Sequence, residues 1–263
     1  MVELNALVAD LRAESDEIDA LVGDLPEDGW ARPTPAAGWT VAHQIAHLAW
    51  TDERALLAAS APEDFVAEFT RYRHEAGIDT AVDKAAAAEA TRPDLLSWWR
   101  EGRDKLAAVL LNMPPGTKLP WYGPSMSATS MATARLMETW AHGQDIADAL
   151  GVRRTPTARL RHVAHIGVRT RDFAYLTRDV PVPAEQFRVE LLGPDGELWT
   201  WGPEDATQRV TGPALEFCLL VTQRVHRADT ALVAVGEDAD HWLSIAQAFA
   251  GPPGAGREIG SRG

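Results

Sequence analysis

Residues 38–53 read GWTVAHQIAHLAWTDE, and they combine the start of a helix with two histidines. Thr40 is a suitable N-cap for a helix of about twenty residues, because its side-chain oxygen can accept a hydrogen bond from the first turn. His43 and His47 are four residues apart, so they lie on one face of that helix. This stretch therefore predicts a helix that presents two imidazoles on the same side.

A second stretch, METWAHGQDIADALG at residues 137–151, has the same spacing between Glu138 and His142. Helical bundles build metal sites from such side chains on facing helices. Imidazole and carboxylate groups bind zinc and other divalent metals, and three protein ligands leave one position open for water or substrate. Spacing alone leaves two interpretations open: a metal site, or histidines that only pack in the core.

The sequence around these stretches predicts a four-helix bundle. Residues 3–24 have apolar positions near the 3.6-residue period of an amphipathic helix. A third helix starts at Pro93 and ends before Pro114, and a fourth spans about residues 127–150. Residues 62–88 are charged and rich in alanine, which is compatible with a broken helix or a lid.

Beyond Pro156 the sequence predicts one more helix, over about residues 157–178, and then a small α+β domain. Residues 187–203, FRVELLGPDGELWTWGP, alternate apolar and polar positions around Pro194-Asp195-Gly196, as in a β-hairpin. A strand near 209–211, a helix in 213–225, a buried strand in 230–236 and a helix in 238–250 follow. We predict a bundle over 1–155, a connecting helix with the α+β domain over 156–250, and a flexible tail over 251–263.

Composition excludes several classes of protein. The 263 residues carry a net charge of −13, which argues against binding to nucleic acid or to an anionic membrane surface. A single cysteine, Cys218, rules out an intramolecular disulfide framework and a multi-cysteine metal cluster. The sequence has no apolar run long enough for a membrane span, and its acidic start does not resemble a signal peptide. We therefore expect a cytoplasmic monomer or homodimer that binds a small molecule.

The two stretches quoted above resemble the paired signatures of DinB-like metal-binding bundles, and more closely the actinobacterial mycothiol-dependent maleylpyruvate isomerase-like family. This resemblance implies a four-helix bundle followed by a small α+β domain. It also implies a divalent metal, usually zinc, bound by His47, Glu138 and His142. The C-terminal third resembles a distinct and mostly uncharacterised subgroup of these proteins.

Two residues near the implied ligands have several possible roles. His43 could replace His47, act as a fourth ligand or serve as an acid/base, or it could be an imidazole on the helix surface or behind a ligand. Asp145 follows His142 by three residues, so it could accept the second N–H of a ligating histidine. A solvated helix acid is an equally good interpretation of Asp145.

Substrate contacts are suggested by two further features. The chain has ten tryptophans, and those of the first 150 residues, Trp50 among them, either pack in the core or line an apolar pocket. Arg224 lies in QRVHRAD at residues 223–229 and could bind an anionic substrate or thiol cofactor, because guanidinium groups pair with carboxylates. A solvated surface cluster is the alternative for this segment.

These features predict a divalent-metal-dependent enzyme of the maleylpyruvate isomerase-like family that acts on a small molecule. Metal-activated thiol chemistry, with mycothiol as a candidate thiol, would give thiol transfer or isomerisation. Lewis-acid catalysis would give elimination, hydrolysis or cyclisation in specialised metabolism. Zinc is the expected metal, but the same ligands accept Ni²⁺, Fe²⁺ or Mn²⁺. The alternative is a non-catalytic, metal-stabilised protein that binds a metal or a small molecule.

Overall fold

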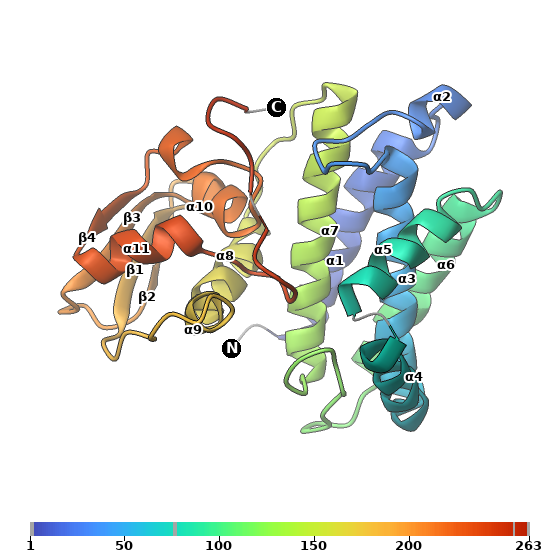
Figure 1. Cartoon of the computed structure of the whole chain (residues 1–263), viewed down its shortest axis with the longest axis horizontal. Coiled ribbons are helices and arrows are strands. Elements are labelled where there is room, and N and C mark those ends of the chain that lie inside the picture. Colours follow the sequence, from blue (N-terminus) through green and yellow to red (C-terminus); the bar gives the residue numbers. More distant parts are fainter. Residues whose placement is uncertain (1–2, 76–77, 255, 262–263) are drawn as a thin grey trace. The chain divides into compact units, whose positions relative to one another are not determined.

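A computed structural model of the chain describes residues 3–75, 78–254 and 256–261 (Figure 1). The chain divides into two compact units, Met1–Arg153 and Arg154–Gly263. The predicted class, a helical bundle followed by a small α+β part, is confirmed. No helix within the described residues is both long and apolar enough to cross a membrane.

The first unit is built on four long helices (Figure 1): α1 (Leu4–Val22), α3 (Val41–Ser60), α6 (Leu95–Leu111) and α7 (Ala128–Leu150). Helix α3 packs against both α6 and α7, and α1 packs against α7 and α6. Their apolar faces meet in a core that excludes water almost completely. This core includes Ile18, Val22, Ile45, Leu48, Trp99 and Ile146.

Shorter helices complete the first unit. Helix α2 (Glu27–Trp30) follows α1, and the region that the sequence left ambiguous forms two helices, α4 (Pro62–Glu75) and α5 (Ile78–Glu89). Both pack against α3. The structure therefore agrees with the interpretation of residues 62–88 as a broken helix, since one helix lies on each side of residues 76–77. Residues 76–77 themselves lie outside the described residues.

Both ends of α7 are fixed by local sequence. Ser127 accepts a hydrogen bond from the Ser130 backbone N–H at 3.1 Å, which satisfies a free donor of the first turn. Gly151 ends the helix in the left-handed conformation, with φ of 69°. The 23 residues between them place Glu138 and His142 in the middle of the helix.

In the second unit, the single helix predicted over residues 157–178 is two helices, α8 (Leu160–Arg169) and α9 (Arg171–Leu176). The break lies at Thr170, whose hydroxyl donates back to the carbonyl oxygens of Ile166 and Gly167 at 3.0 and 3.1 Å. Such side-chain bonds compete with the helical backbone pattern and bend or end a helix. The prediction of one continuous helix was wrong for this reason.

A four-stranded sheet in the order β2-β1-β3-β4 forms the rest of the second unit, together with α10 (Ala214–Val221) and α11 (Glu237–Ile245). The hairpin predicted in residues 187–203 is confirmed, with Leu192 paired to Leu198. Strand β1 runs antiparallel to β2 and parallel to β3. The strands are β1 (Phe187–Leu192), β2 (Leu198–Trp201), β3 (Gln208–Pro213) and β4 (Val233–Val235).

The last strand and the C-terminal segment were both predicted from the sequence. Strand β4 forms as predicted, but it lies at the sheet edge with Val233 55% and Val235 54% exposed, so the prediction that it is buried was wrong. In the predicted tail, residues 251–263, positions 255, 262 and 263 lie outside the described residues. Gly260 in this segment donates its backbone N–H to Asp229 Oδ2 at 2.7 Å.

Candidate metal centre

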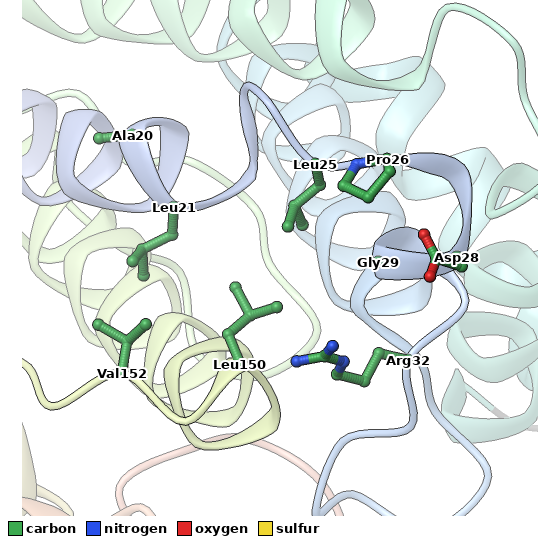
Figure 2. A pocket seen from close by; sticks show the side chains of 9 residues that line it. All are labelled: Ala20, Leu21, Leu25, Pro26, Asp28, Gly29, Arg32, Leu150 and Val152. Carbon is green, nitrogen blue, oxygen red and sulfur yellow. The ribbon is translucent and has the colours of Figure 1, made fainter.

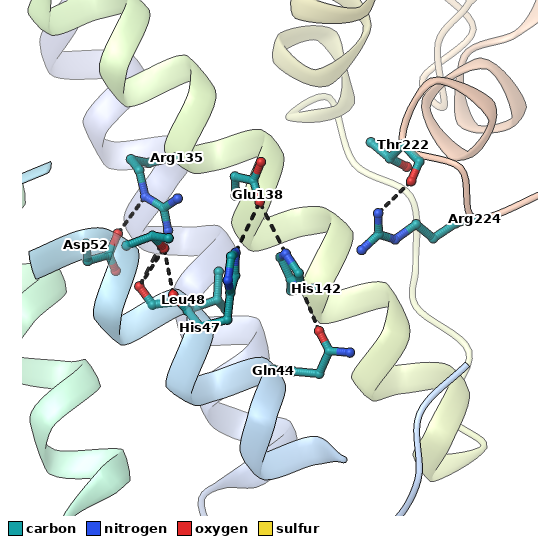
Figure 3. Close-up of polar contacts among 10 residues, drawn as sticks. Gln44, His47, Leu48, Asp52, Arg135, Glu138, His142, Thr222 and Arg224 are labelled. Carbon is teal, nitrogen blue, oxygen red and sulfur yellow. Dashed lines mark hydrogen bonds and ion pairs between the residues drawn. The ribbon is translucent and has the colours of Figure 1, made fainter. Parts of the chain in front are cut away.

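The start of α3 places the first histidine of the pair. Thr40 precedes the helix, and its backbone N–H donates to His43 Nδ1 at 3.3 Å. The Thr40 hydroxyl lies 2.8 Å from the same nitrogen. This is a capping box in which histidine takes the place usual for Glu or Gln. One turn further along, His47 points from α3 towards α7 (Figure 3).

Three of the predicted side chains meet between α3 and α7 (Figure 3). One ligand atom from each of His47, Glu138 and His142 lies within 4.8 Å of the others. Glu138 Oε2 is 3.2 Å from His142 Nε2 and 3.6 Å from His47 Nε2. All three side chains are largely buried. Residues from distant parts of the sequence thus form one compact group with two nitrogens and a carboxylate.

His47 is the least satisfied member of this group. Both of its ring nitrogens are buried without a hydrogen-bond partner among the described residues. The 3.6 Å separation from Glu138 is too long for a good hydrogen bond, so that contact is electrostatic. The ring packs against His142 at 4.4 Å and against Trp39 at 5.4 Å between centroids. A buried polar group without a partner costs about 1–3 kcal/mol, which a bound cation would offset.

Glu138 is held in its charged form. Burial by itself raises the pKa of this carboxyl group, but the imidazoles of His142 and His47 outweigh burial and hold its pKa well below the ordinary value. Glu138 is therefore a carboxylate at neutral pH, which is the state that binds a cation.

Behind the three side chains lies a residue that the sequence did not single out. Gln44 is completely buried, and its Oε1 lies 2.5 Å from His142 Nδ1. Gln44 lies three residues before His47, so both side chains are on one face of α3. This spacing is the feature of the sequence that could have indicated Gln44 as part of the site. Trp39 covers the same region, with its indole stacked on the His142 ring at 6.0 Å and 20°.

The remaining predicted site residues are placed as follows. His43 is engaged by Thr40 and is not one of the three side chains whose ligand atoms converge. Asp145 is buried on α7, with 3% of its surface exposed. Trp50 is buried and stacks on Tyr122, with ring centroids 6.4 Å apart. Arg224 belongs to the second unit.

Arg224 is shown in Figure 3 with its Nη1 donating to the Thr222 backbone carbonyl at 2.5 Å.

A separate hollow of about 350 Å³ lies in the first unit, where the turn after α1 approaches the end of α7 (Figure 2). Its walls include Leu21, Leu25 and Leu150, with Arg32 at its edge. None of the converging side chains lines this hollow, so it is not the ligand cavity of the candidate centre.

Two imidazoles and a carboxylate on facing helices are side chains of the kind from which helical bundles build metal sites. The family model described as mycothiol maleylpyruvate isomerase N-terminal domain matches residues 11–147, and the chain belongs to this family. The membership expected from the sequence is confirmed. A second model, described as wyosine base formation, matches residues 183–235.

The chain is also similar to two relatives and to two solved structures. Uncharacterised proteins from two strains of Mycobacterium tuberculosis are 57% identical over 260 residues, which is 98% of this chain and 100% of each relative. Crystal structures of the mycothiol-dependent maleylpyruvate isomerase and of a histidine-to-alanine mutant share the fold. Each aligns with a TM-score of 0.59 and 16% identity, over 89% of this chain and 93% of the other.

Proposed function

We propose that this chain is a divalent-metal-dependent enzyme that acts on a small molecule through thiol chemistry. The observation that supports the proposal best is the convergence of His47, Glu138 and His142 within 4.8 Å inside a helical bundle. The proposed metal is Zn²⁺, with Ni²⁺, Fe²⁺ and Mn²⁺ as alternatives for the same ligands. The proposed thiol is mycothiol, which the family description names.

The three side chains fit a metal ion in chemistry, and the two separations measured from Glu138 fit it in size. Two nitrogens or oxygens bound tetrahedrally to zinc are about 3.4 Å apart, given bonds of about 2.0–2.2 Å. The observed separations of 3.2 and 3.6 Å lie on either side of that value. The unpartnered nitrogens of His47 also fit, because a cation would satisfy one of them. Two imidazoles and one carboxylate leave a fourth position for a substrate or thiol.

A divalent ion at this position would lower the pKa of a bound thiol, giving a thiolate near neutral pH, or would polarise a substrate carbonyl. Residues of the chain itself would supply negative charge at the metal position and would keep water away from the ligands. Glu138 would contribute a negative charge that offsets part of the charge of a bound cation, and burial would strengthen that interaction. Trp39 packs on the rings of His47 and His142 and keeps water from their faces.

The other predicted residues complete the proposal. His43 is the candidate acid/base, Asp145 a candidate partner of a ligand, and Trp50 and Arg224 candidate substrate contacts. Thiol transfer or isomerisation is the favoured reaction, with Lewis-acid elimination, hydrolysis or cyclisation as the alternative. The protein would act in the cytoplasm as a monomer or homodimer.

Metal content of the purified protein tests the ligand assignment. We expect about one zinc per chain, and at least about tenfold less in His47→Ala, Glu138→Ala and His142→Ala. Removing a metal ligand should weaken zinc binding at least as much as removing a side chain that hydrogen-bonds to a ligand. His74→Ala, at an exposed position of α4, is the matched control and should keep its metal. Unchanged metal content in all three ligand variants would refute the assignment.

Turnover separates an enzyme from a metal-stabilised binding protein. A mixture of mycothiol and maleylpyruvate, or of another thiol and electrophile, should be converted by the metal-loaded protein. Glu138→Ala and His142→Ala should lose this activity. A protein that binds stoichiometric zinc but converts none of these mixtures would favour the non-catalytic alternative.

A further inference from the structure

We infer that Gln44, oriented by Thr34, is a positioning residue that keeps a proton on His142 Nδ1 and so turns Nε2 towards the metal position. The inference rests on the proposed function, since it concerns how this chain prepares one of its three ligands. It follows from the direction of three consecutive hydrogen bonds.

The first bond fixes the hydroxyl of Thr34. Its Oγ1 lies 3.0 Å from the backbone carbonyl oxygen of Trp39. A carbonyl oxygen can only accept, and a hydroxyl has a single proton. Thr34 therefore donates that proton to Trp39 and has only acceptor capacity left for other partners.

The second bond fixes the amide of Gln44. Its Nε2 lies 2.9 Å from Thr34 Oγ1, which can now only accept. The amide nitrogen must therefore face Thr34, and Oε1 must face the opposite side, towards His142. Because Gln44 is completely buried, water cannot satisfy the reversed orientation of the amide.

The third bond fixes the tautomer of His142. Its Nδ1 lies 2.5 Å from Gln44 Oε1, which is an acceptor, so Nδ1 must carry a proton. A neutral imidazole has no second ring proton, so Nε2 then presents a lone pair to Glu138 Oε2 at 3.2 Å. Two acceptors that face each other need a positive charge between them, either a metal ion or a second ring proton that makes the imidazole an imidazolium. A reversed amide would instead move the proton to Nε2 and block the ligand atom.

The loop before α3 makes this arrangement rigid. The Thr34 backbone N–H also donates to the Trp39 carbonyl, at 2.8 Å, and Pro33 pairs with Thr40 in a short antiparallel bridge. Gly38 supplies the left-handed conformation that the turn needs, with φ of 80°. The loop that holds the Trp39 indole against the two histidine rings thus also sets the direction of the hydrogen bonds.

Nitrogen-15 NMR of the histidine rings tests the inference in the metal-free protein, at a pH above the ordinary histidine pKa. We expect His142 Nδ1 to be protonated in the unmodified chain. Gln44→Met, which keeps the length of the side chain but removes the acceptor, should shift the proton towards Nε2. Gln44→Glu keeps an acceptor for Nδ1 and should keep the proton there, while the Thr34 hydroxyl turns from the Trp39 carbonyl to donate to the new carboxylate.

Zinc affinity, measured by competition with a chelator, gives a second readout. Gln44→Met should weaken binding about 10- to 100-fold, as expected for a partner of a ligating histidine. Gln44→Glu should bind as tightly as the unmodified chain, and Thr34→Val should weaken binding while Thr34→Ser restores it. The matched control is Gln144→Met on α7, where the amide donates to Asp148 Oδ1 at 2.7 Å and zinc affinity should not change.

The outcomes distinguish this inference from the proposed function. A proton on Nε2 alone in the metal-free chain overturns the inference, as do unchanged tautomer and zinc affinity in both Gln44→Met and Thr34→Val. If the unmodified chain binds no metal, the proposed function fails, but the ring tautomer still decides the role of Gln44. Should Gln44→Met not fold, the Thr34→Val and Thr34→Ser pair gives the answer.

Discussion

Two histidines that the spacing in the sequence does not distinguish have different surroundings in the fold. His43 and His47 lie on one face of α3, but His43 lies in the first turn, whereas His47 lies one turn further along and faces Glu138 on α7 (Figure 3). There the backbone N–H of Thr40 needs an acceptor, and His43 Nδ1 provides it. Position along the helix, not spacing, separates a candidate ligand from a capping residue.

We predict that His43→Ala keeps its metal and loses about 1 kcal/mol of folding stability, since the variant loses a capping interaction. His43→Gln should recover most of that stability, because glutamine is a common residue at this position of a capping box. Elemental analysis and thermal unfolding measure the two effects. Loss of metal in His43→Gln would instead make His43 a ligand, and lost turnover with full metal would give its imidazole an acid/base role.

At the residue scale, the sequence indicated the site only in part. His47, Glu138 and His142 stand out because metal-ligating side chains recur at helical spacing, and the resemblance to a family selects them. Gln44 does not stand out, since an amide has no ligand signature. Its role depends on Thr34, ten residues earlier in a loop, and on a hydrogen-bond direction that no periodicity encodes.

At the scale of elements, apolar periodicity predicted the bundle helices well because each buries one face. The expected helix over 3–24 forms as Leu4–Val22, and its buried positions follow that face. The periodicity of the sequence did not predict two features that depend on a single side chain or on neighbouring strands. The break at Thr170 comes from its own hydroxyl, and the exposure of β4 comes from its place at the sheet edge.

A buried ion pair joins α7 to α3 near the candidate centre (Figure 3). Arg135 Nε donates to Asp52 Oδ1 at 2.8 Å, and the side chains are only 2% and 7% exposed. Burial raises the pKa of Asp52 above its ordinary value, and the attraction of Arg135 opposes that rise without cancelling it. The two charges therefore depend on each other for compensation.

We predict that Arg135→Met destabilises the protein by about 3–5 kcal/mol, since it leaves Asp52 buried without its partner. The double variant with Asp52→Leu should recover most of this loss, because it buries no charge. Lys105→Met, which removes an exposed pair with Glu101 on α6, is the control and should change stability by less than about 0.5 kcal/mol. A double variant no more stable than Arg135→Met in urea unfolding would contradict the explanation.

The packing of α1 against α6 should depend on pH. Asp19 on α1 accepts from Arg100 Nε at 2.8 Å and from Arg103 Nη2 at 2.9 Å, both on α6. The hydrogen bond from Arg100, helped by the charge of Arg103, lowers the pKa of Asp19 below its ordinary 3.8 against a smaller opposing effect of burial. A lowered pKa in the folded state adds stability above the unfolded-state pKa, and this stability is lost as pH falls through the folded-state pKa.

Asp19→Asn should therefore cost about 1 kcal/mol at neutral pH, and its difference from the unmodified chain should shrink as the pH falls below about 4. Thermal unfolding across a pH series measures this difference. Asp16→Asn is the matched control on α1, since Asp16 is 70% exposed and also pairs with Arg103. A difference that stays constant down to strongly acidic pH would show that the Asp19 charge does not act in this way.

At the scale of the whole molecule, the three side chains that converge at the candidate centre come from the first unit. His47, Glu138 and His142, and also Gln44 and Thr34 behind them, all lie within Met1–Arg153. That unit has its own buried core and a length typical of an independent domain. Metal binding should therefore not require the second unit, which contains Arg224 and the sheet.

We predict that a fragment of residues 1–153 folds alone and binds the same amount of zinc per chain as the full protein. Circular dichroism and elemental analysis test folding and metal content separately, and the same fragment with Glu138→Ala serves as the metal-free control. A folded fragment that lacks zinc, beside a full chain that holds it, would place a necessary ligand outside this unit. An unfolded fragment would show that the bundle needs the second unit for stability, because its own core does not offset the conformational entropy that folding costs.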